Sequence, residues 1–365
     1  MRVALVAPLV SAIREPQRGG SQAFISDLAR GLVVRGHDVE LYCASGSEVP
    51  GVRVIETDVD PDALAASLYR ASGPAPERGL APAEAAFASV YSIVRRADYD
   101  LVHNHAFDAP AIALAESVPA PIVHTLHLPP EPAVARALQA ALHADRPPTV
   151  ATVSNAQARA WRRVVAVDAI LPPLVPTGEI PWSASPGDGA VFAGRLSPEK
   201  GALEAIEIAR AAGVAIELYG DPYDPEYARE RIEPRRDDPG VDVRPGVPRT
   251  EIWEVMARAA VLLFPAMWEE PFGMAAAEAQ ACGTPVVAFR SGALGEVILD
   301  GVTGFLVTPG DLGAAAQAVH SAASLLRSRC REHAERDLDL ALSLDAHERL
   351  YERVVRGRVE VATGG

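Results

Sequence analysis

The sequence predicts an α/β protein of two domains, each built around a parallel sheet. Short runs of apolar, often β-branched residues alternate with helical stretches along almost the whole chain, which is the pattern of βαβ units. The stretch 171–178 is rich in proline and interrupts this alternation near the middle. At 365 residues, the chain is also longer than one compact core usually allows. We therefore expect one domain on each side of the interruption, with a ligand site in the cleft between them.

The first half contains five predicted strands, each a short apolar run with a helical stretch after it. They are expected at residues 3–6, 39–43, 101–103, 122–124 and 150–153. The first of these runs could pass for a signal-peptide core, but Pro8 interrupts it and a helical stretch soon follows. We interpret it as a strand and expect a cytoplasmic protein.

The second half contains six predicted strands of the same kind. They are expected at residues 190–193, 216–219, 241–243, 261–264, 286–288 and 305–307. We place an N-terminal domain at residues 1–178, a C-terminal domain at 179–344, and a final helix at 345–365 that crosses back to the first domain.

The final helix is predicted from a four-residue apolar spacing. Ala346, Leu350 and Val354 form the stripe, Ser343 is the expected N-cap, and Gly357 is the expected end of the helix.

Composition and charge exclude several classes of protein. The net charge of −14 argues against a nucleic-acid-binding protein, which needs a basic surface. No apolar stretch reaches the length that spans a membrane. Cys43, Cys282 and Cys330 are far apart and odd in number, so they predict neither a disulfide framework nor a metal cluster.

An acidic pair, Glu270 and Glu278, lies on the two sides of a predicted helix start. Glu270 follows the strand 261–264, and Glu278 is expected about two turns into the next helix. A carboxylate can accept hydrogen bonds from two neighbouring hydroxyls, while the N–H groups of a helix start bind oxygen or phosphate. The pair therefore favours a nucleotide sugar as ligand, although a surface helix that happens to carry glutamates would show the same spacing.

Two cations follow the first strand of the second half. Arg195 lies in the loop, and Lys200 is expected in the first helical turn, with Ser197 as N-cap and Pro198 as the first helical residue. A lysine at that place opposes the helix dipole unless an anion joins it. Arg195 and Lys200 are therefore candidates for binding a diphosphate; a solvated lysine and a structural arginine are the alternative.

A glycine pair, Gly19 and Gly20, follows the first strand of the chain. Adjacent glycines let the backbone approach a phosphate, but the pair taken by itself favours a plain turn. The three spaced glycines of the dinucleotide-binding fingerprint are missing, which argues against a dehydrogenase.

Histidines close two strands of the first half. His103 and His105 alternate along one strand, so we expect both to point the same way, toward the cleft. His127 ends the next strand, and with His103 it is a candidate for lining an acceptor pocket. A metal site would need a third ligand, and none has suitable spacing. A structural role for these histidines is the alternative.

Taken together, these segments resemble the retaining glycosyltransferases of family 4, which have the GT-B fold of two facing Rossmann-like domains with a cleft between them. The motifs that carry the resemblance are Gly194-Arg195-Leu196 with Glu199-Lys200-Gly201, the Glu270 to Glu278 pair around Pro271-Phe272-Gly273, Gly283-Thr284-Pro285-Val286-Val287, and Gly301-Val302-Thr303-Gly304-Phe305-Leu306-Val307. The linker departs from the family pattern, because residues 171–174 read Leu-Pro-Pro-Leu where the family has Ile-Pro-Asn-Gly.

The resemblance implies a site for the nucleotide part of a nucleotide-diphosphate sugar. Arg195 and Lys200 would hold the diphosphate, and Gly20 would approach it from the other domain. Glu278 would bind the ribose hydroxyls, and backbone groups near Val247 would touch the base.

The resemblance also implies where the transferred hexose binds. Glu270 and the backbone of Phe272, Gly273 and Met274 would hold the hexose, and His105 would lie near both the hexose and the acceptor. Together with the two diphosphate-binding cations, Glu270 and His105 would carry the catalysis.

The implied reaction moves a hexose, with retention of configuration, from a nucleotide sugar to an acceptor hydroxyl. The expected donor is a UDP-sugar, with a GDP-sugar as the second choice. The acceptor is a small molecule, an oligosaccharide or a lipid-linked molecule. The cations balance the diphosphate charge, so neither a metal nor a cofactor is expected. The first half offers no clear carboxylate nucleophile, which favours same-face attack by the acceptor. An epimerase of the same fold and a non-catalytic nucleotide-sugar-binding protein are the alternatives.

Overall fold

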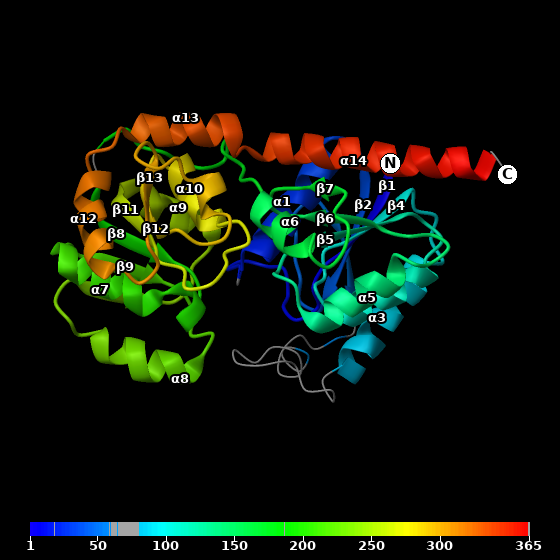
Figure 1. Cartoon of the computed structure of the whole chain (residues 1–365), viewed down its shortest axis with the longest axis horizontal. Helices are drawn as coiled ribbons and strands as arrows, with labels where there is room; N and C mark the ends of the chain where they lie inside the picture. The colour runs from blue at the N-terminus through cyan, green and yellow to red at the C-terminus, as the bar shows by residue number, and fades with distance from the viewer. Residues whose placement is uncertain (18, 58, 60–63, 65–79, 186, 364–365) are drawn as a thin grey trace. The chain divides into compact units, whose positions relative to one another are not determined.

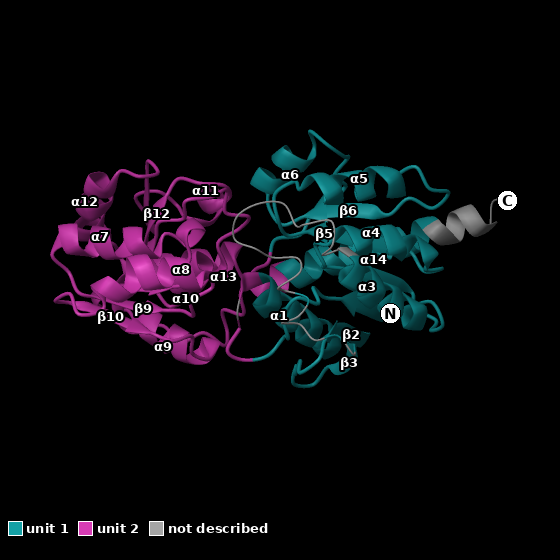
Figure 2. Ribbon diagram, turned by 90° about the horizontal axis from the view of Figure 1, so that it is seen from below, with its two compact units in different colours: residues 1–14, 21–172, 343–365 teal, residues 15–20, 173–342 magenta. Residues whose placement is uncertain are grey.

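The computed structural model describes residues 1–17, 19–57, 59, 64, 80–185 and 187–363 (Figure 1). Contacts divide the chain into two compact units, which Figure 2 colours separately. Unit 1 comprises Met1–Arg14, Ser21–Pro172 and Ser343–Gly365, and unit 2 comprises Glu15–Gly20 and Pro173–Leu342. No helix in the described part of the chain is both long and apolar enough to cross a membrane.

Unit 1 contains a seven-stranded parallel sheet in the order β3-β2-β1-β4-β5-β6-β7. Its strands are β1 (Arg2–Val6), β2 (Asp38–Ala44), β3 (Arg53–Thr57), β4 (Leu101–Asn104), β5 (Ile122–Leu126), β6 (Thr149–Thr152) and β7 (Ala169–Ile170). All five predicted strands are confirmed, each end lying within two residues of its expected place. The sequence analysis missed β3, whose side chains are mostly half-exposed or exposed, and β7, which has only two residues.

The helices of unit 1 lie between these strands along the chain. They are α1 (Gly20–Val34), α3 (Leu80–Val94), α4 (Ala109–Ala113), α5 (Pro132–Ala141), α6 (Asn155–Trp161) and the greater part of α14 (Leu340–Thr363). A separate 3₁₀ turn covers Leu114–Ser117.

The final helix α14 is longer than expected at both ends. It begins at Leu340, where the Asp339 carboxylate accepts a hydrogen bond from the N–H of Ala341. Ser343 is therefore an interior residue rather than the N-cap, and its hydroxyl donates to the Pro172 carbonyl at 2.6 Å. Gly357 also lies inside the helix, because a glycine ends a helix only where the backbone turns left-handed, and this one does not.

Ion pairs attach α14 to the rest of unit 1. Arg35 lies 2.6 Å from Asp345 and 2.5 Å from Glu348, and His37 lies 2.9 Å from Glu348. At Gly31 of α1, an added Cβ would lie 2.6 Å from Leu344, so the glycine permits the close packing of α1 and α14.

Unit 2 contains a six-stranded parallel sheet in the order β10-β9-β8-β11-β12-β13. Its strands are β8 (Asp188–Ala193), β9 (Ile216–Tyr219), β10 (Val241–Arg244), β11 (Ala259–Phe264), β12 (Val286–Phe289) and β13 (Gly304–Val307). All six predicted strands are confirmed, each end within two residues of its expected place. The α/β class with two parallel sheets is thus confirmed.

The helices of unit 2 connect these parallel strands. They are α7 (Ala202–Ala212), α8 (Pro225–Tyr227), α9 (Arg249–Arg258), α10 (Met274–Ala281), α11 (Leu294–Val297), α12 (Leu312–Ala322) and α13 (Arg327–Asp337), with short 3₁₀ or π turns at Pro198–Lys200, Ala228–Ile232 and Glu233–Arg235. The core includes Ile206 of α7, Val319 of α12, and Leu218 and Leu263 of the sheet. Because all strands are parallel, the loops that follow β8, β10 and β11 leave the same edge of the sheet, which places the motifs of the second half together.

The stretch after Pro172 belongs to unit 2, whereas the sequence placed the boundary at residue 178. The physical reason is the buried guanidinium of Arg331, which donates to the carbonyls of Thr177 at 2.9 Å and Ile180 at 3.1 Å. Val175 also forms a β-bridge with Asp339. Backbone groups with buried partners in unit 2 move with that unit, despite their proline-rich sequence.

Candidate functional site

The centre of the site in unit 2 is an ion pair between Lys200 and Glu270. The ammonium nitrogen lies 2.8 Å from Glu270 Oε2, and the two side chains are only 19% and 9% exposed. The indole N–H of Trp268 donates to the same oxygen at 2.7 Å, and the ammonium lies 4.8 Å from the centre of the indole ring. One carboxylate oxygen thus receives two donors, and the aromatic face adds a cation–π contact to the lysine.

The approach of these two loops depends on Gly201. An added Cβ there would lie 2.0 Å from the carbonyl oxygen of Pro265, in the loop after β11, and the residue has a left-handed φ of 73°. Any other side chain would therefore push the two loops apart. Since β8 and β11 are neighbours in the sheet, the loops that follow them meet although they lie far apart in the sequence.

The expected position of Lys200 in the first turn of an α-helix is wrong. Pro198–Lys200 forms a separate 3₁₀ turn, Gly201 ends it, and α7 begins at Ala202. Ser197 precedes the turn, but its hydroxyl makes no capping hydrogen bond. The left-handed glycine breaks the helical run, and Lys200 is thereby directed toward Glu270.

Arg195 lies on the same loop but has different partners. Its guanidinium is 3.3 Å from Glu199 and 4.2 Å from the centre of the Tyr223 ring. It is partly exposed, so it can still turn toward an anion at modest cost.

The second acid, Glu278, is the fifth residue of α10 and so lies just over one turn into the helix, not two. It is buried, and its Oε1 accepts a hydrogen bond from Nε of Arg249. Glu270 and Glu278 therefore have separate cationic partners, Lys200 and Arg249.

The start of α10 is formed by residues 272–274. Gly273 has a φ of 102°, and an added Cβ would lie 2.6 Å from a methyl group of Leu294, so only glycine fits. No side chain among the described residues caps this helix. The N–H of Ala276 donates to the Gly273 carbonyl at 3.0 Å, which leaves the first two N–H groups of the helix for a ligand. The backbone of Phe272, Gly273 and Met274 is thus suited to the role that the resemblance implies.

Residues 291–293, after β12, hold the backbone of Glu270. The N–H of Ala293 donates to the Glu270 carbonyl at 2.8 Å, and the Ser291 hydroxyl donates to the Trp268 carbonyl. An added Cβ on Gly292 would lie 2.1 Å from the Glu270 carbonyl oxygen. The acid therefore has a fixed backbone as well as fixed side-chain partners.

Two further predicted donor-site residues lie in unit 2. Val247 is half-buried in the loop after β10, where the neighbouring Gly246 N–H donates to Asp221 at 3.0 Å. Gly20 was expected to approach from the other domain, but contacts group it with unit 2, where an added Cβ on it would lie 3.2 Å from the sulfur of Met274 at the start of α10.

The predicted histidines cluster in unit 1. The rings of His103 and His105 lie 4.0 Å apart, which confirms that they point the same way. His103 is fully buried, and its two nitrogens lie 2.6 Å from the Tyr351 hydroxyl and 2.7 Å from the Thr125 hydroxyl. Because both nitrogens have protein partners, the geometry favours the structural alternative for His103.

His105 has a different surrounding. Its Nδ1 lies 3.0 Å from Nε2 of His127, while its own Nε2 is buried without a hydrogen-bond partner among the described residues. Burial lowers the pKa of His105 well below its ordinary value and that of His127 to about 4. The pair is therefore neutral at pH 7, shares one proton between its facing nitrogens, and leaves His105 Nε2 for a ligand.

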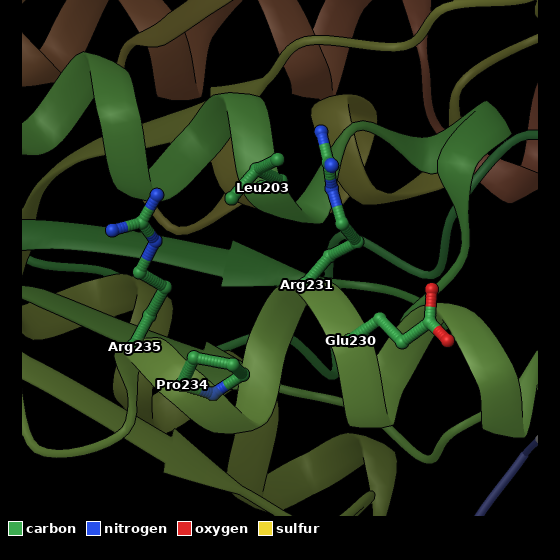
Figure 3. Close-up of a pocket in the computed structure, with 5 residues that line it drawn as sticks. All are labelled: Leu203, Glu230, Arg231, Pro234 and Arg235. Carbon is green, nitrogen blue, oxygen red and sulfur yellow. The ribbon is translucent and has the colours of Figure 1, made fainter.

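No group of three or more histidine, cysteine or acidic side chains among the described residues is arranged to hold a metal ion. A surface pocket of about 290 Å³ in unit 2 lies between Leu203 of α7 and the turns that carry Glu230, Arg231, Pro234 and Arg235 (Figure 3). It contains none of the predicted site residues.

Sequence reasoning missed three residues of this site: Trp268, Ser291 and Arg249. Trp268 had a local signal, because it lies two positions before Glu270. A further signal was overlooked at Lys200, which is the only lysine among the 34 lysine and arginine residues of the chain. An ammonium is a compact point charge that fits between an aromatic face and a carboxylate, whereas the larger planar guanidinium does not replace it there.

Comparisons with known proteins agree with this geometry. A family model described as Glycosyl transferases group 1 matches residues 187–337, and one described as Glycosyltransferase Family 4 matches residues 18–178. The chain is 30% identical to a D-inositol 3-phosphate glycosyltransferase of Xylanimonas cellulosilytica, over 84% of either protein.

Solved structures agree in fold. A sucrose-phosphate synthase from Thermosynechococcus elongatus gives a TM-score of 0.78 at 19% identity, over 98% of this chain and 100% of the other. HepE of Anabaena in complex with UDP and glucose gives 0.73 at 19% identity, over 96% of this chain and 99% of the other. The fold is thus the two-domain GT-B architecture, and with the family models and the Xylanimonas relative it defines a glycosyltransferase. More narrowly, the chain belongs to the glycosyltransferases of family 4.

The Trp268 indole gives a first testable consequence. Trp268→Phe keeps an aromatic face beside Lys200 but removes the N–H that donates to Glu270. A hydrogen bond to a charged group contributes about 1.5–3 kcal/mol, so we expect sugar transfer to slow about tenfold or more, with unchanged affinity for the free nucleotide. Steady-state kinetics and calorimetry measure the two quantities, and Trp182→Phe, at a tryptophan 45% exposed, is the control. Equal loss of nucleotide affinity would contradict this role.

Proposed function

We propose that this glycosyltransferase moves a hexose from a nucleotide-diphosphate sugar to an acceptor hydroxyl with retention of configuration. UDP-sugars are the favoured donors and GDP-sugars the next choice. The observation that carries the proposal is the Lys200–Glu270–Trp268 arrangement beside the uncapped start of α10. It combines a cation for the leaving diphosphate with an oriented carboxylate for sugar hydroxyls.

The chemistry of the bond broken explains these groups. When the anomeric C–O bond breaks, negative charge develops on the diphosphate and positive charge on the sugar carbon. Lys200, Arg195 and the first-turn N–H groups of α10 would stabilise the diphosphate, and such preorganised groups usually supply the largest part of catalysis. Since these groups supply positive charge themselves, we propose that transfer needs neither a bound metal nor a cofactor.

The acceptor is proposed to attack from the face that the diphosphate leaves. This preference comes from the sequence, where residues 1–178 offer no clear carboxylate nucleophile. His105 would contact the sugar or the acceptor through its Nε2, which has no hydrogen-bond partner among the described residues. His127 would hold His105 in place or line the acceptor pocket. A covalent glycosyl-enzyme intermediate trapped with a slow donor would overturn the same-face step.

The acceptor class is supported by relatives only in broad terms. The Xylanimonas relative is named for a polyol phosphate, D-inositol 3-phosphate. We therefore propose a hydroxyl-bearing small molecule as acceptor, with oligosaccharides and lipid-linked acceptors next. The three free, buried cysteines are consistent with the cytoplasmic location expected from the sequence.

A thermal-shift panel tests the donor directly. Uridine, guanosine and thymidine diphosphates and their sugar conjugates are added singly to the full chain, and we expect UDP-sugars to raise the melting temperature most. Mass spectrometry of the products, with and without an acceptor panel, then separates transfer from epimerisation. Conversion of the donor sugar without acceptor would favour an epimerase; binding without any product would favour a non-catalytic binding protein.

A further inference from the structure

Glu278 and Arg249 form an ion pair that is largely removed from water. The carboxylate of Glu278 accepts from Nε of Arg249, and the two side chains are 9% and 10% exposed. The surrounding helix α10 is otherwise built mainly of buried alanines. Burying a charge costs free energy unless an opposite charge compensates it, so this pair differs from a solvent-exposed surface ion pair.

Arg249 is itself held in place by three features of unit 2. It is the first residue of α9, its N–H donates to the Glu15 carboxylate at 3.0 Å, and its guanidinium lies 5.0 Å from the centre of the buried Trp253 ring. The helix start and the charged acceptor therefore fix the backbone of Arg249, and the aromatic ring restrains its guanidinium before any ligand arrives.

The ion pair uses one of the two carboxylate oxygens of Glu278. The hydrogen bond found for Glu278 within the described residues uses Oε1, and Oε2 remains for another donor. A rigid guanidinium on Oε1 thus determines where Oε2 points. Because a side chain fixed beforehand loses less entropy on binding, this arrangement strengthens whatever hydrogen bond Oε2 makes.

We propose that Arg249 is a positioning residue, which holds Glu278 in the orientation that binds the ribose hydroxyls of the donor nucleotide. The inference rests on the proposed function, since it takes a ribonucleotide as the ligand of Glu278. It goes beyond the sequence motifs, which contain Glu278 but not Arg249. It also separates Arg249 from Lys200 and Arg195, which are proposed to act on the diphosphate.

The test compares a ribonucleotide with its 2′-deoxy analogue. Affinities of UDP and 2′-deoxy-UDP are measured by calorimetry for wild type, Arg249→Gln, Glu278→Gln and the double variant. Arg258→Gln is the matched control, because Arg258 ends the same helix, is 56% exposed and lies 3.7 Å from Glu217. If another nucleotide of the panel binds more tightly than UDP, it and its deoxy analogue are used instead.

Positioning predicts a loss that is specific to the ribose. Arg249→Gln should weaken UDP binding about tenfold or more, the size expected for a charged hydrogen bond, while 2′-deoxy-UDP binding changes much less. The double variant should bind UDP no more weakly than Glu278→Gln alone, since residues that act as one unit are not additive. Arg258→Gln should bind both nucleotides as the wild type does.

Other outcomes overturn the inference. Equal losses for UDP and 2′-deoxy-UDP, or additive losses in the double variant, would assign Arg249 to the diphosphate instead. Unchanged affinities for both nucleotides would leave it without a role in ribose binding. If Arg249→Gln fails to fold, Arg249→Lys replaces it, because it keeps the charge and loses the Nε geometry. If wild type binds no nucleotide at all, the proposed function itself falls, an outcome distinct from the others.

Discussion

Lys200→Ala is expected to lower the rate of sugar transfer by about 10²–10³, the usual loss when one preorganised donor to a developing negative charge is removed. The Lys200 ammonium lies 2.8 Å from the Glu270 carboxylate and 4.8 Å from the centre of the Trp268 ring, in the site proposed to bind the donor. Its removal leaves the leaving diphosphate without this cation and Glu270 without its ionic partner. Steady-state kinetics with the donor and acceptor found in the panels measures the loss.

The controls separate the ammonium from general charge. Arg229→Ala removes an exposed cation of the same unit that pairs with Glu230, and it should leave transfer unchanged. Lys200→Arg keeps the charge but replaces a point charge by a wider planar group, so we expect it to recover only part of the activity. A melting temperature close to that of the wild type shows that Lys200→Ala is folded.

The uniqueness of Lys200 offers a direct readout of binding. Reductive methylation with ¹³C-formaldehyde labels this one lysine and the N-terminal amine, whose signals differ in chemical shift. Addition of a nucleoside diphosphate should shift the lysine signal and leave the N-terminal one in place. Normal turnover of Lys200→Ala, or a lysine signal that does not respond to any nucleotide of the panel, would remove Lys200 from the diphosphate site.

The second large effect is a loss of stability in mild acid. Burial lowers the pKa of His124 to about 3 and those of His127 and His347 to about 4, and it lowers those of His103 and His105 well below their ordinary value. In the unfolded chain these histidines have a pKa of ~6.5. Between about pH 6.5 and about pH 4 the unfolded state therefore binds more protons, and the free energy of unfolding falls as the pH falls.

The size of the effect follows from the same shifts. At about pH 5.5, each histidine that stays neutral in the folded state contributes about 1.4 kcal/mol less to the free energy of unfolding than it does well above pH 7. Asp108 works in the opposite direction, because burial raises its pKa to about 7 and its protonation favours the folded state in this range. It offsets roughly one of the five histidines, so the net loss is several kcal/mol, a large part of the ~5–15 kcal/mol that stabilises a typical protein.

Hydrogen exchange and urea unfolding between about pH 7.5 and about pH 5.5 measure this loss. All five histidines lie in unit 1, so we expect protection to fall first in β4, β5 and α14. His347→Phe should reduce the pH slope by up to one proton, and His320→Asn, at an exposed histidine of unit 2, should not. A free energy of unfolding that stays constant over this range would show that the cluster is not buried as a neutral group.

Much of the fold was predictable because its signals are local. Apolar runs of three to five residues predicted the eleven strands correctly, since a buried parallel strand needs an apolar segment regardless of its neighbours. β3 was not predicted because its side chains are mostly half-exposed or exposed. The ends of α14 were misplaced because Ser343 and Gly357 resemble caps but lie inside the helix.

The part of the candidate site that depends on local sequence was also predictable. The sequence by itself determined which segments carry Glu270, Glu278, Arg195 and Lys200, and that each follows a strand. It also determined the glycosyltransferase family, since these motifs are contiguous. Gly273 could be expected at the start of α10, because a left-handed turn at a helix start favours glycine.

Only the tertiary structure decided which charges meet. Lys200 pairs with Glu270, and Arg249 with Glu278, because the sheet order places β8 beside β11 and brings α9 to α10. In the same way, Tyr351 of α14 lies within hydrogen-bonding distance of His103, while Nε2 of His105 has no partner in the part of the chain that the structure describes. Periodicity and spacing describe one segment at a time, whereas these contacts depend on the order of strands in space, which no single segment contains.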